Sequence, residues 1–106
     1  MKNAVLQFEG GQLCVKGSLH FNNVGPLFEQ GCRLLKENSP FDIDLSGVTY
    51  SDSAGIALLV AWKRAAYETK RALQFKNIPP QMQNLVRICG IENMLELRTA
   101  HGNISH

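Results

Sequence analysis

The residues best suited to chemistry in this sequence form the stretch DSAG, from Asp52 to Gly55, where a strand-like run meets an apolar helix-like run. A helix N-terminus leaves backbone N–H groups without partners, so Asp52 or Ser53 could accept hydrogen bonds from them as the N-cap. Such a cap stabilises a helix by about 1 kcal/mol and alone accounts for the acid and the hydroxyl. Phosphorylation and docking are the other two roles open to Ser53.

A phosphate on Ser53 would sit at the positive end of the helix dipole, where an anion is favoured. It would also add negative charge beside Asp52, so the fold could tolerate it while a partner's contact is lost. Gly55 favours a close contact, because a glycine inside a helix costs about 1 kcal/mol relative to alanine. Its missing side chain would let backbone or a partner approach.

No arrangement elsewhere in the sequence indicates catalysis. The histidines, His20, His101 and His106, are not placed beside a serine or cysteine as a base for a nucleophile. Neither the dinucleotide pattern GxGxxG nor the phosphate-binding GxxxxGK[ST] occurs. Three widely spaced cysteines, Cys14, Cys32 and Cys89, are expected to be reduced and mostly buried. The sequence therefore favours a protein that is not an enzyme and that has no cofactor or metal site.

The order of apolar and turn residues predicts an α/β fold. The expected elements are strands at 4–8 and 12–16 around a Gly-Gly turn, a helix at 24–38, a strand at 41–45, a loop at 46–52, a helix from 53 to about 69, a strand at 73–77, and a helix at 81–89. Residues 91–97 could add a short strand or helical turn. The strands at 41–45 and 73–77 are joined through a helical crossover and are therefore expected to be parallel.

We therefore expect one domain over residues 1–106, with 1–3 and 101–106 frayed, since a chain of this length can build one core. The expected architecture is a mixed sheet of four to five strands with three to four helices packed mainly on one side. The net charge of +2 comes from scattered basic residues, which makes nucleic acid binding a weak interpretation. The longest apolar run, 56–62, is far shorter than the ~20 residues of a membrane span, so a soluble cytoplasmic protein without direct membrane insertion is expected.

The stretch DLSGVTYSDSAGIALL resembles the signature of STAS domains, the fold of bacterial anti-sigma-factor antagonists and of regulatory modules on transporters. Ser53 matches the serine that is phosphorylated in the antagonists, and Asp52 and Gly55 match the positions flanking it. Asp44 and Ser46 match the polar end of the preceding strand. The resemblance covers most of the chain, from LCVKGSL to CGIENML.

Within that family, SDSAGIALLVAWKRAA followed by LQFKNIPPQMQNLVRICGIENML is most similar to the small STAS subunits of phospholipid-transporting ABC complexes. This resemblance implies a partner, the ATPase subunit of a complex that also contains a membrane permease, whose assembly and activity the domain supports. It also implies a role in outer-membrane lipid asymmetry and a place peripheral to the inner membrane. The main alternative is an anti-sigma-factor antagonist regulated by phosphorylation of Ser53. A third, a nucleotide-binding STAS domain, lacks a recognisable phosphate cradle.

Two apolar stripes run along the helix that follows DSAG, and a helix on one face of a sheet buries only one stripe fully. The resemblance puts Ile56, Leu59 and Val60 inward, which leaves Leu58 and Trp62 facing outward. One hypothesis is that Trp62 packs under the first or third helix. The other is a docking face for the ATPase, made of the signature residues and an apolar anchor with a basic rim: Asp52, Ser53, Ala54, Gly55, Leu58, Trp62, and Lys63 or Arg64.

Overall fold

The structure is a computed structural model that describes residues 4–38 and 42–95. The described part of the chain begins with a β-hairpin formed by β1 (Val5–Glu9) and β2 (Gln12–Leu19). Glu9 pairs with Gln12, so Gly10 and Gly11 alone form the turn. Both have positive φ, 58° and 80°, the backbone conformation that a two-residue hairpin turn requires and that glycine adopts without strain. The predicted Gly-Gly hairpin is confirmed. The ends expected to fray, 1–3 and 101–106, lie outside the described residues.

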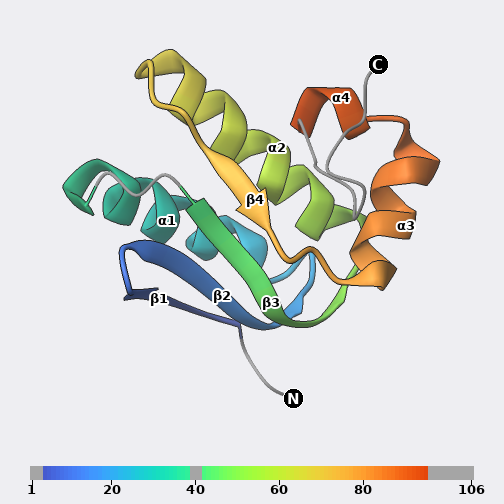
Figure 1. The fold of residues 1–106 in the computed structure, drawn as a ribbon. Coiled ribbons are helices and arrows are strands. Elements are labelled where there is room, and N and C mark those ends of the chain that lie inside the picture. The colour runs from blue at the N-terminus through green and yellow to red at the C-terminus, as the bar shows by residue number, and fades with distance from the viewer. Residues whose placement is uncertain (1–3, 39–41, 96–106) are drawn as a thin grey trace.

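Two helical crossovers then extend the hairpin into a four-stranded sheet (Figure 1). α1 (Val24–Asn38) connects β2 to β3 (Asp42–Ser51), and α2 (Ser53–Glu68) connects β3 to β4 (Gln74–Lys76). The pairs β2–β3 and β3–β4 are parallel, and the strand order is β1-β2-β3-β4. α3 (Pro80–Cys89) ends at Gly90, whose φ of 69° closes the helix, and α4 (Glu92–Leu95) follows. The predicted α/β fold with a mixed sheet is confirmed.

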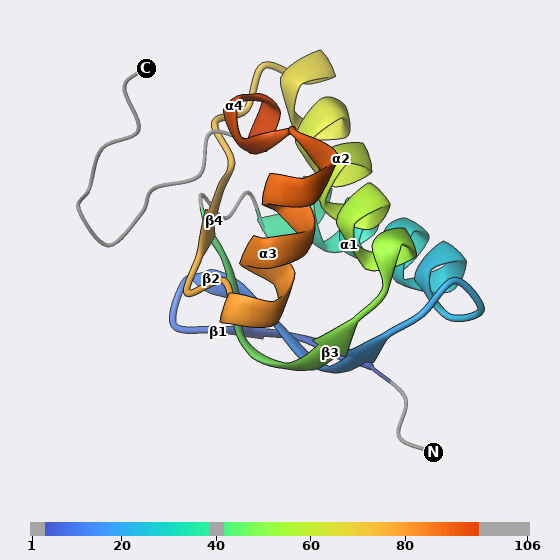
Figure 2. The same ribbon diagram turned by 90° about the vertical axis from the view of Figure 1, so that its right-hand side faces the viewer.

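The helices cover one face of the sheet, as Figure 2 shows. The strand residues that face them form the centre of the core and are fully buried, among them Leu13, Val15, Ile43 and Leu45. The opposite face carries polar side chains and ion pairs such as Lys16–Glu9, with Nζ and Oε2 3.7 Å apart. Helices packed mainly on one side of the sheet were therefore predicted correctly. No helix in the described part of the chain is both long and apolar enough to cross a membrane.

β3 is longer than the sequence indicates, because residues 46–51, predicted as part of a loop, continue the strand to Ser51. Val48 and Ser51 are buried, and the segment stays paired with β2 through Ser51 opposite Leu19. Irregularities in the β2–β3 register between Cys14 and Lys16 and between Gly17 and Ser18 shift the alternation of inward and outward residues. The alternation of apolar and polar residues that marks a strand is therefore lost in this part of the sequence, although the strand continues.

The prediction that Leu58 and Trp62 face outward is wrong. Leu58 is 3% exposed and Trp62 is fully buried, so both residues belong to the core. The indole Nε1 of Trp62 donates to the carbonyl of Phe28, 3.2 Å away, which places the ring under α1. This is the alternative in which Trp62 packs beneath the first helix. Ile56 and Leu59 point inward as expected, whereas Val60 is only half-buried.

The contact between α1 and the Trp62 ring depends on Gly31, because a Cβ at that position would lie 2.5 Å from the ring. We predict that Gly31→Ala lowers the free energy of unfolding by about 1–3 kcal/mol, the usual effect of overpacking a core. Gly25→Ala, in the same helix but with open space around its Cβ, should leave stability unchanged or raise it by up to about 1 kcal/mol. Urea denaturation of both variants measures the difference, and equal effects would contradict this packing.

Candidate functional site

Asp52 is the N-cap of α2 and joins the start of this helix to the end of β2 and the residues that follow it. Its Oδ1 accepts hydrogen bonds from the backbone N–H groups of Ala54, at 2.8 Å, and Gly55, at 3.3 Å. Its Oδ2 accepts from the N–H of Phe21, at 3.2 Å, in the segment that follows β2. Its own N–H donates to the carbonyl of Leu19. The predicted cap is therefore Asp52, and Ser53 is the first residue of the helix, with an exposed side chain.

Gly55 allows the first turn of α2 to lie directly against the ends of β2 and β3. A Cβ on Gly55 would lie 2.0 Å from Ser51 Oγ and 2.9 Å from the Cβ of Leu19. The close approach that the sequence indicates is therefore made by the chain itself. Gly55 is buried and has no side chain to offer a partner, whereas Ala54 is half-buried and exposes part of its methyl group.

A glutamine from α3 completes this junction, and the sequence pattern alone does not single it out. The N–H of Ser51 donates to Gln81 Oε1 at 2.9 Å, and Gln81 Nε2 donates to the carbonyl of Ser51 at 2.7 Å. The amide thus pairs with the last residue of β3 much as another strand would. The buried hydroxyl of Ser51 donates to the carbonyl of Asp52 at 2.8 Å.

Three aromatic side chains lie on the segments next to Asp52, at the end of β3 and directly after β2, and only His20 among them is half-buried. Together with Ser53 they form what we call the Ser53 surface: His20, Phe21, Tyr50 and Ser53. Phe21 is 78% exposed and Tyr50 47% exposed, and the rings of His20 and Tyr50 lie 5.7 Å apart between centroids. The local sequence pattern does not indicate these aromatic residues as a group. A helical crossover between the strands at 12–16 and 41–45 implies a parallel pair whose carboxyl ends meet at one edge of the sheet, but the register that places His20 beside Tyr50 cannot be read from the sequence.

The remaining predicted site residues lie elsewhere. Leu58 and Trp62 are buried in the core and line no exposed face of the isolated chain. Lys63 is half-buried on the second half of α2, where its Nζ donates to the carbonyl of Leu73, and Arg64 beside it is exposed. The structure therefore brings together the DSAG residues, but not the apolar anchor and basic rim expected beside them.

Asp44 and Ser46 are also distant from Ser53, because β3 continues to Ser51 and places Asp44 about 23 Å back along the strand. Asp44 accepts from Asn77 Nδ2 and from the N–H of Ser46, both at 3.0 Å. Burial acts to raise the pKa of Asp44, but these bonds, the Ser46 hydroxyl and the charge of Lys76 outweigh it, so the pKa lies below its usual value. The two residues stabilise the start of the strand and are not part of the Ser53 surface.

All three cysteines are free thiols, of which Cys14 is buried, Cys32 half-buried and Cys89 exposed. The expectation that they are mostly buried is thus wrong for Cys89, which lies at the last position of α3. Burial raises the pKa of the Cys14 and Cys32 thiols, and neighbouring carboxylates add to this effect. Within residues 4–38 and 42–95, no group of three metal-ligating side chains is close enough to hold an ion.

The assignment of the cap to Asp52 makes a prediction about stability. We expect Asp52→Ala to lower the free energy of unfolding by about 1–2 kcal/mol, because it leaves the N–H groups of Ala54, Gly55 and Phe21 without their acceptor. Ser53→Ala should change it by less than about 0.5 kcal/mol, as expected for a surface position. Urea denaturation at neutral pH compares the two, and an equal loss in Ser53→Ala would mean that the serine is the cap.

Comparison with known proteins agrees with this geometry. A family model described as "Mlab, STAS domain" matches residues 3–97 of the 106-residue chain. No curated protein sequence matches this chain. Among solved structures, the anti-sigma factor antagonist SpoIIAA in its unphosphorylated form has a TM-score of 0.67 at 13% identity, with 93% of this chain and 90% of that chain covered. At that identity the similarity shows the fold alone.

Two chains from the Acinetobacter MlaFEDB complex, in its ATP-bound Vtrans2 and Vtrans1 conformations, each have a TM-score of 0.73. Their identities are 25% and 28%, and the matches cover 88% of this chain and 98% and 99% of the matched chains. The family model spans most of the sequence, and the same fold extends over nearly the whole of both matched chains. The chain therefore belongs to the MlaB-type STAS domain family.

Proposed function

We propose that this domain is a non-enzymatic subunit that binds the ATPase of an Mla-type phospholipid ABC transporter and supports its assembly and activity. The single observation that carries the proposal is the family match over residues 3–97. The similarity to chains of the MlaFEDB complex supports it. Such a subunit lies on the cytoplasmic side, peripheral to the inner membrane through a complex that includes a permease. Its role there is to help maintain outer-membrane lipid asymmetry.

We further propose that the Ser53 surface is the part of the domain that contacts the ATPase. Phe21, with 78% of its surface exposed, and Tyr50, with 47%, are large aromatic side chains that the isolated fold covers only in part. Aromatic residues of this kind supply much of the binding energy at protein interfaces. The bond from Phe21 N–H to Asp52 fixes the Phe21 backbone beside the helix that carries Ser53, so a partner meets a preorganised surface.

The alternative, a phosphorylation-regulated anti-sigma-factor antagonist, draws support from the exposure of Ser53 at the first position of α2. The cap is one consideration against it. Asp52 Oδ1 already accepts from the N–H groups of Ala54 and Gly55, so a phosphate on Ser53 would compete with a carboxylate for the same donors. It would also place its charge beside that carboxylate. The antagonists carry a matching acid beside their phosphorylated serine, so the cap alone does not separate the two roles, and the family match is the reason to prefer Ser53 as a contact residue.

The experiment is to measure binding of the purified ATPase to wild-type and variant domains by isothermal titration calorimetry. We expect Phe21→Ala and Tyr50→Ala each to weaken binding about tenfold or more, the effect of removing an interface hot spot. Ile88→Ala is the matched control, because Ile88 is an exposed apolar residue on α3, 80% exposed, outside the Ser53 surface. It should leave the affinity unchanged.

Three results would contradict these proposals, and they can be told apart. Wild-type domain that does not bind the ATPase would contradict the transporter function itself. Binding that is equally strong in all variants would retain the function but place the contact elsewhere. Purification of the native domain with a serine kinase and with phosphate on Ser53, identified by mass spectrometry, would favour the antagonist.

A further inference from the structure

A hollow of about 450 Å³ lies beside the second half of α2, against the segment that leads into β4. It is lined by Val60, Lys63, Arg64, Tyr67, Arg71, Ala72, Leu73 and Gln74. Tyr67 is fourteen residues beyond Ser53 on α2, which corresponds to about 21 Å along the helix axis. The hollow is thus separate from the Ser53 surface and lies toward the other end of the same helix.

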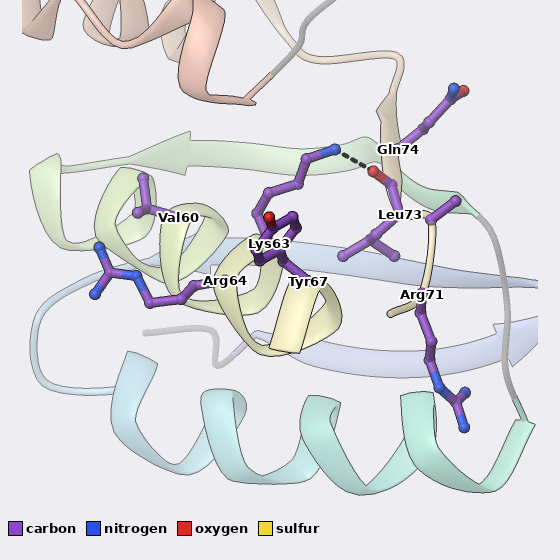
Figure 3. Close-up of a pocket in the computed structure, with 8 residues that line it drawn as sticks. Val60, Lys63, Arg64, Tyr67, Arg71, Leu73 and Gln74 are labelled. Carbon is purple, nitrogen blue, oxygen red and sulfur yellow. Dashed lines mark hydrogen bonds between the residues drawn. The ribbon is translucent and has the colours of Figure 1, made fainter. Parts of the chain in front are cut away.

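The interior of the hollow is apolar. Val60 and Leu73 contribute aliphatic side chains, of which Leu73 is 3% exposed, and Ala72 adds a methyl group. The ring of Tyr67 is 81% exposed beside them, although tyrosine usually packs its ring against other side chains. Figure 3 shows Val60, Tyr67 and Leu73 around the hollow, which gives a large apolar side chain a place to bind.

Three cationic side chains surround this apolar centre, and none of the eight lining residues is acidic. Lys63 is held by its bond to the carbonyl of Leu73, and Arg71 Nη1 donates to the carbonyl of Leu35 at 2.7 Å. Arg64 is exposed and makes no ion pair with any residue in the described part of the chain. In Figure 3 the side chains of Arg64 and Arg71 extend to opposite sides of the hollow, with the apolar residues between them.

We propose that this hollow binds a short acidic segment of a partner protein, in which a large apolar side chain is flanked by carboxylates. The apolar side chain occupies the space beside Tyr67 and Leu73, and the flanking carboxylates pair with Arg64 on one side and Arg71 on the other. Guanidinium groups suit this role because they bind carboxylates in a fixed bidentate geometry. A membrane surface fits less well, since it would need cations on one convex plane, whereas these diverge around a concavity.

β4 offers a sheet edge beside the hollow along which such a segment can lie. Gln74, which lines the hollow, is the first residue of β4, and β4 is an edge of the described sheet. An extended peptide can therefore lie beside the strand while its side chains reach the hollow. This inference goes beyond the proposed ATPase contact and does not rest on it, because it concerns a different part of α2 and its test needs no transporter subunit.

The test is a titration of ¹⁵N-labelled full-length domain, followed by NMR, with the capped peptide Glu-Asp-Leu-Phe-Asp-Glu. Two matched peptides serve as controls, one with Gln and Asn in place of the acids and one with Ser in place of Leu and Phe. We expect the acidic apolar peptide to shift the amide signals of residues 60–74 with a sub-millimolar Kd. Both controls should bind about tenfold more weakly or not at all, because each lacks one of the two features the hollow recognises.

Charge reversal locates the site. Arg64→Glu should weaken the peptide about tenfold, while Arg33→Glu, the same change at an exposed position on α1, should alter the Kd less than about twofold. Shifts scattered over the surface, equal binding of the uncharged peptide, or equal effects of the two variants would overturn the proposal. So would absence of peptide binding combined with Arg64-dependent sedimentation on phosphatidylglycerol vesicles, which would assign the cations to a lipid surface.

Discussion

The Asp52 carboxylate is the interaction on which the rest of this structure depends. It accepts backbone hydrogen bonds from the first turn of α2 and from the segment after β2. The backbone N–H of Asp52 donates to the carbonyl of Leu19, the last residue of β2. The end of β2 and the start of α2, which are far apart in the sequence, are thereby fixed at one point. A charged acceptor is suited to this, because bonds to an ionised carboxylate are stronger than bonds between neutral groups.

This junction leaves no room for a side chain where α2 meets the strands, which explains why the DSAG signature needs a glycine as well as an acid. Gly55 lies against Ser51 and Leu19, and Gln81 holds the backbone of Ser51 from the other side. With the first amides of α2 already bonded to Asp52, Ser53 is left exposed at the surface, next to the residue that binds the Phe21 backbone. The residues that stabilise the fold therefore also set the orientation of the surface proposed to bind the partner.

The sequence predicts well what depends on local chemistry. The Gly-Gly turn, the cap before α2 and the α1 boundaries at Val24 and Asn38 follow from residue types a few positions apart, and the parallel strands follow from the crossovers. The errors come from tertiary contacts. The continuation of β3 through a polar segment depends on its pairing with an irregular β2, and the burial of Trp62 depends on the missing side chain of Gly31 in another helix. The grouping of His20 and Tyr50 needs the strand register, which no local pattern specifies.

Hydrogen–deuterium exchange of the full-length domain, alone and saturated with the ATPase, tests the central claim most directly. The account predicts slower exchange in the segments that carry the Ser53 surface, residues 20–23 and 50–57, with little change at 60–74. Protection confined to 60–74, or to the uncovered face of the sheet, would show that the junction at Asp52 stabilises the fold without forming the contact. That result would contradict the account.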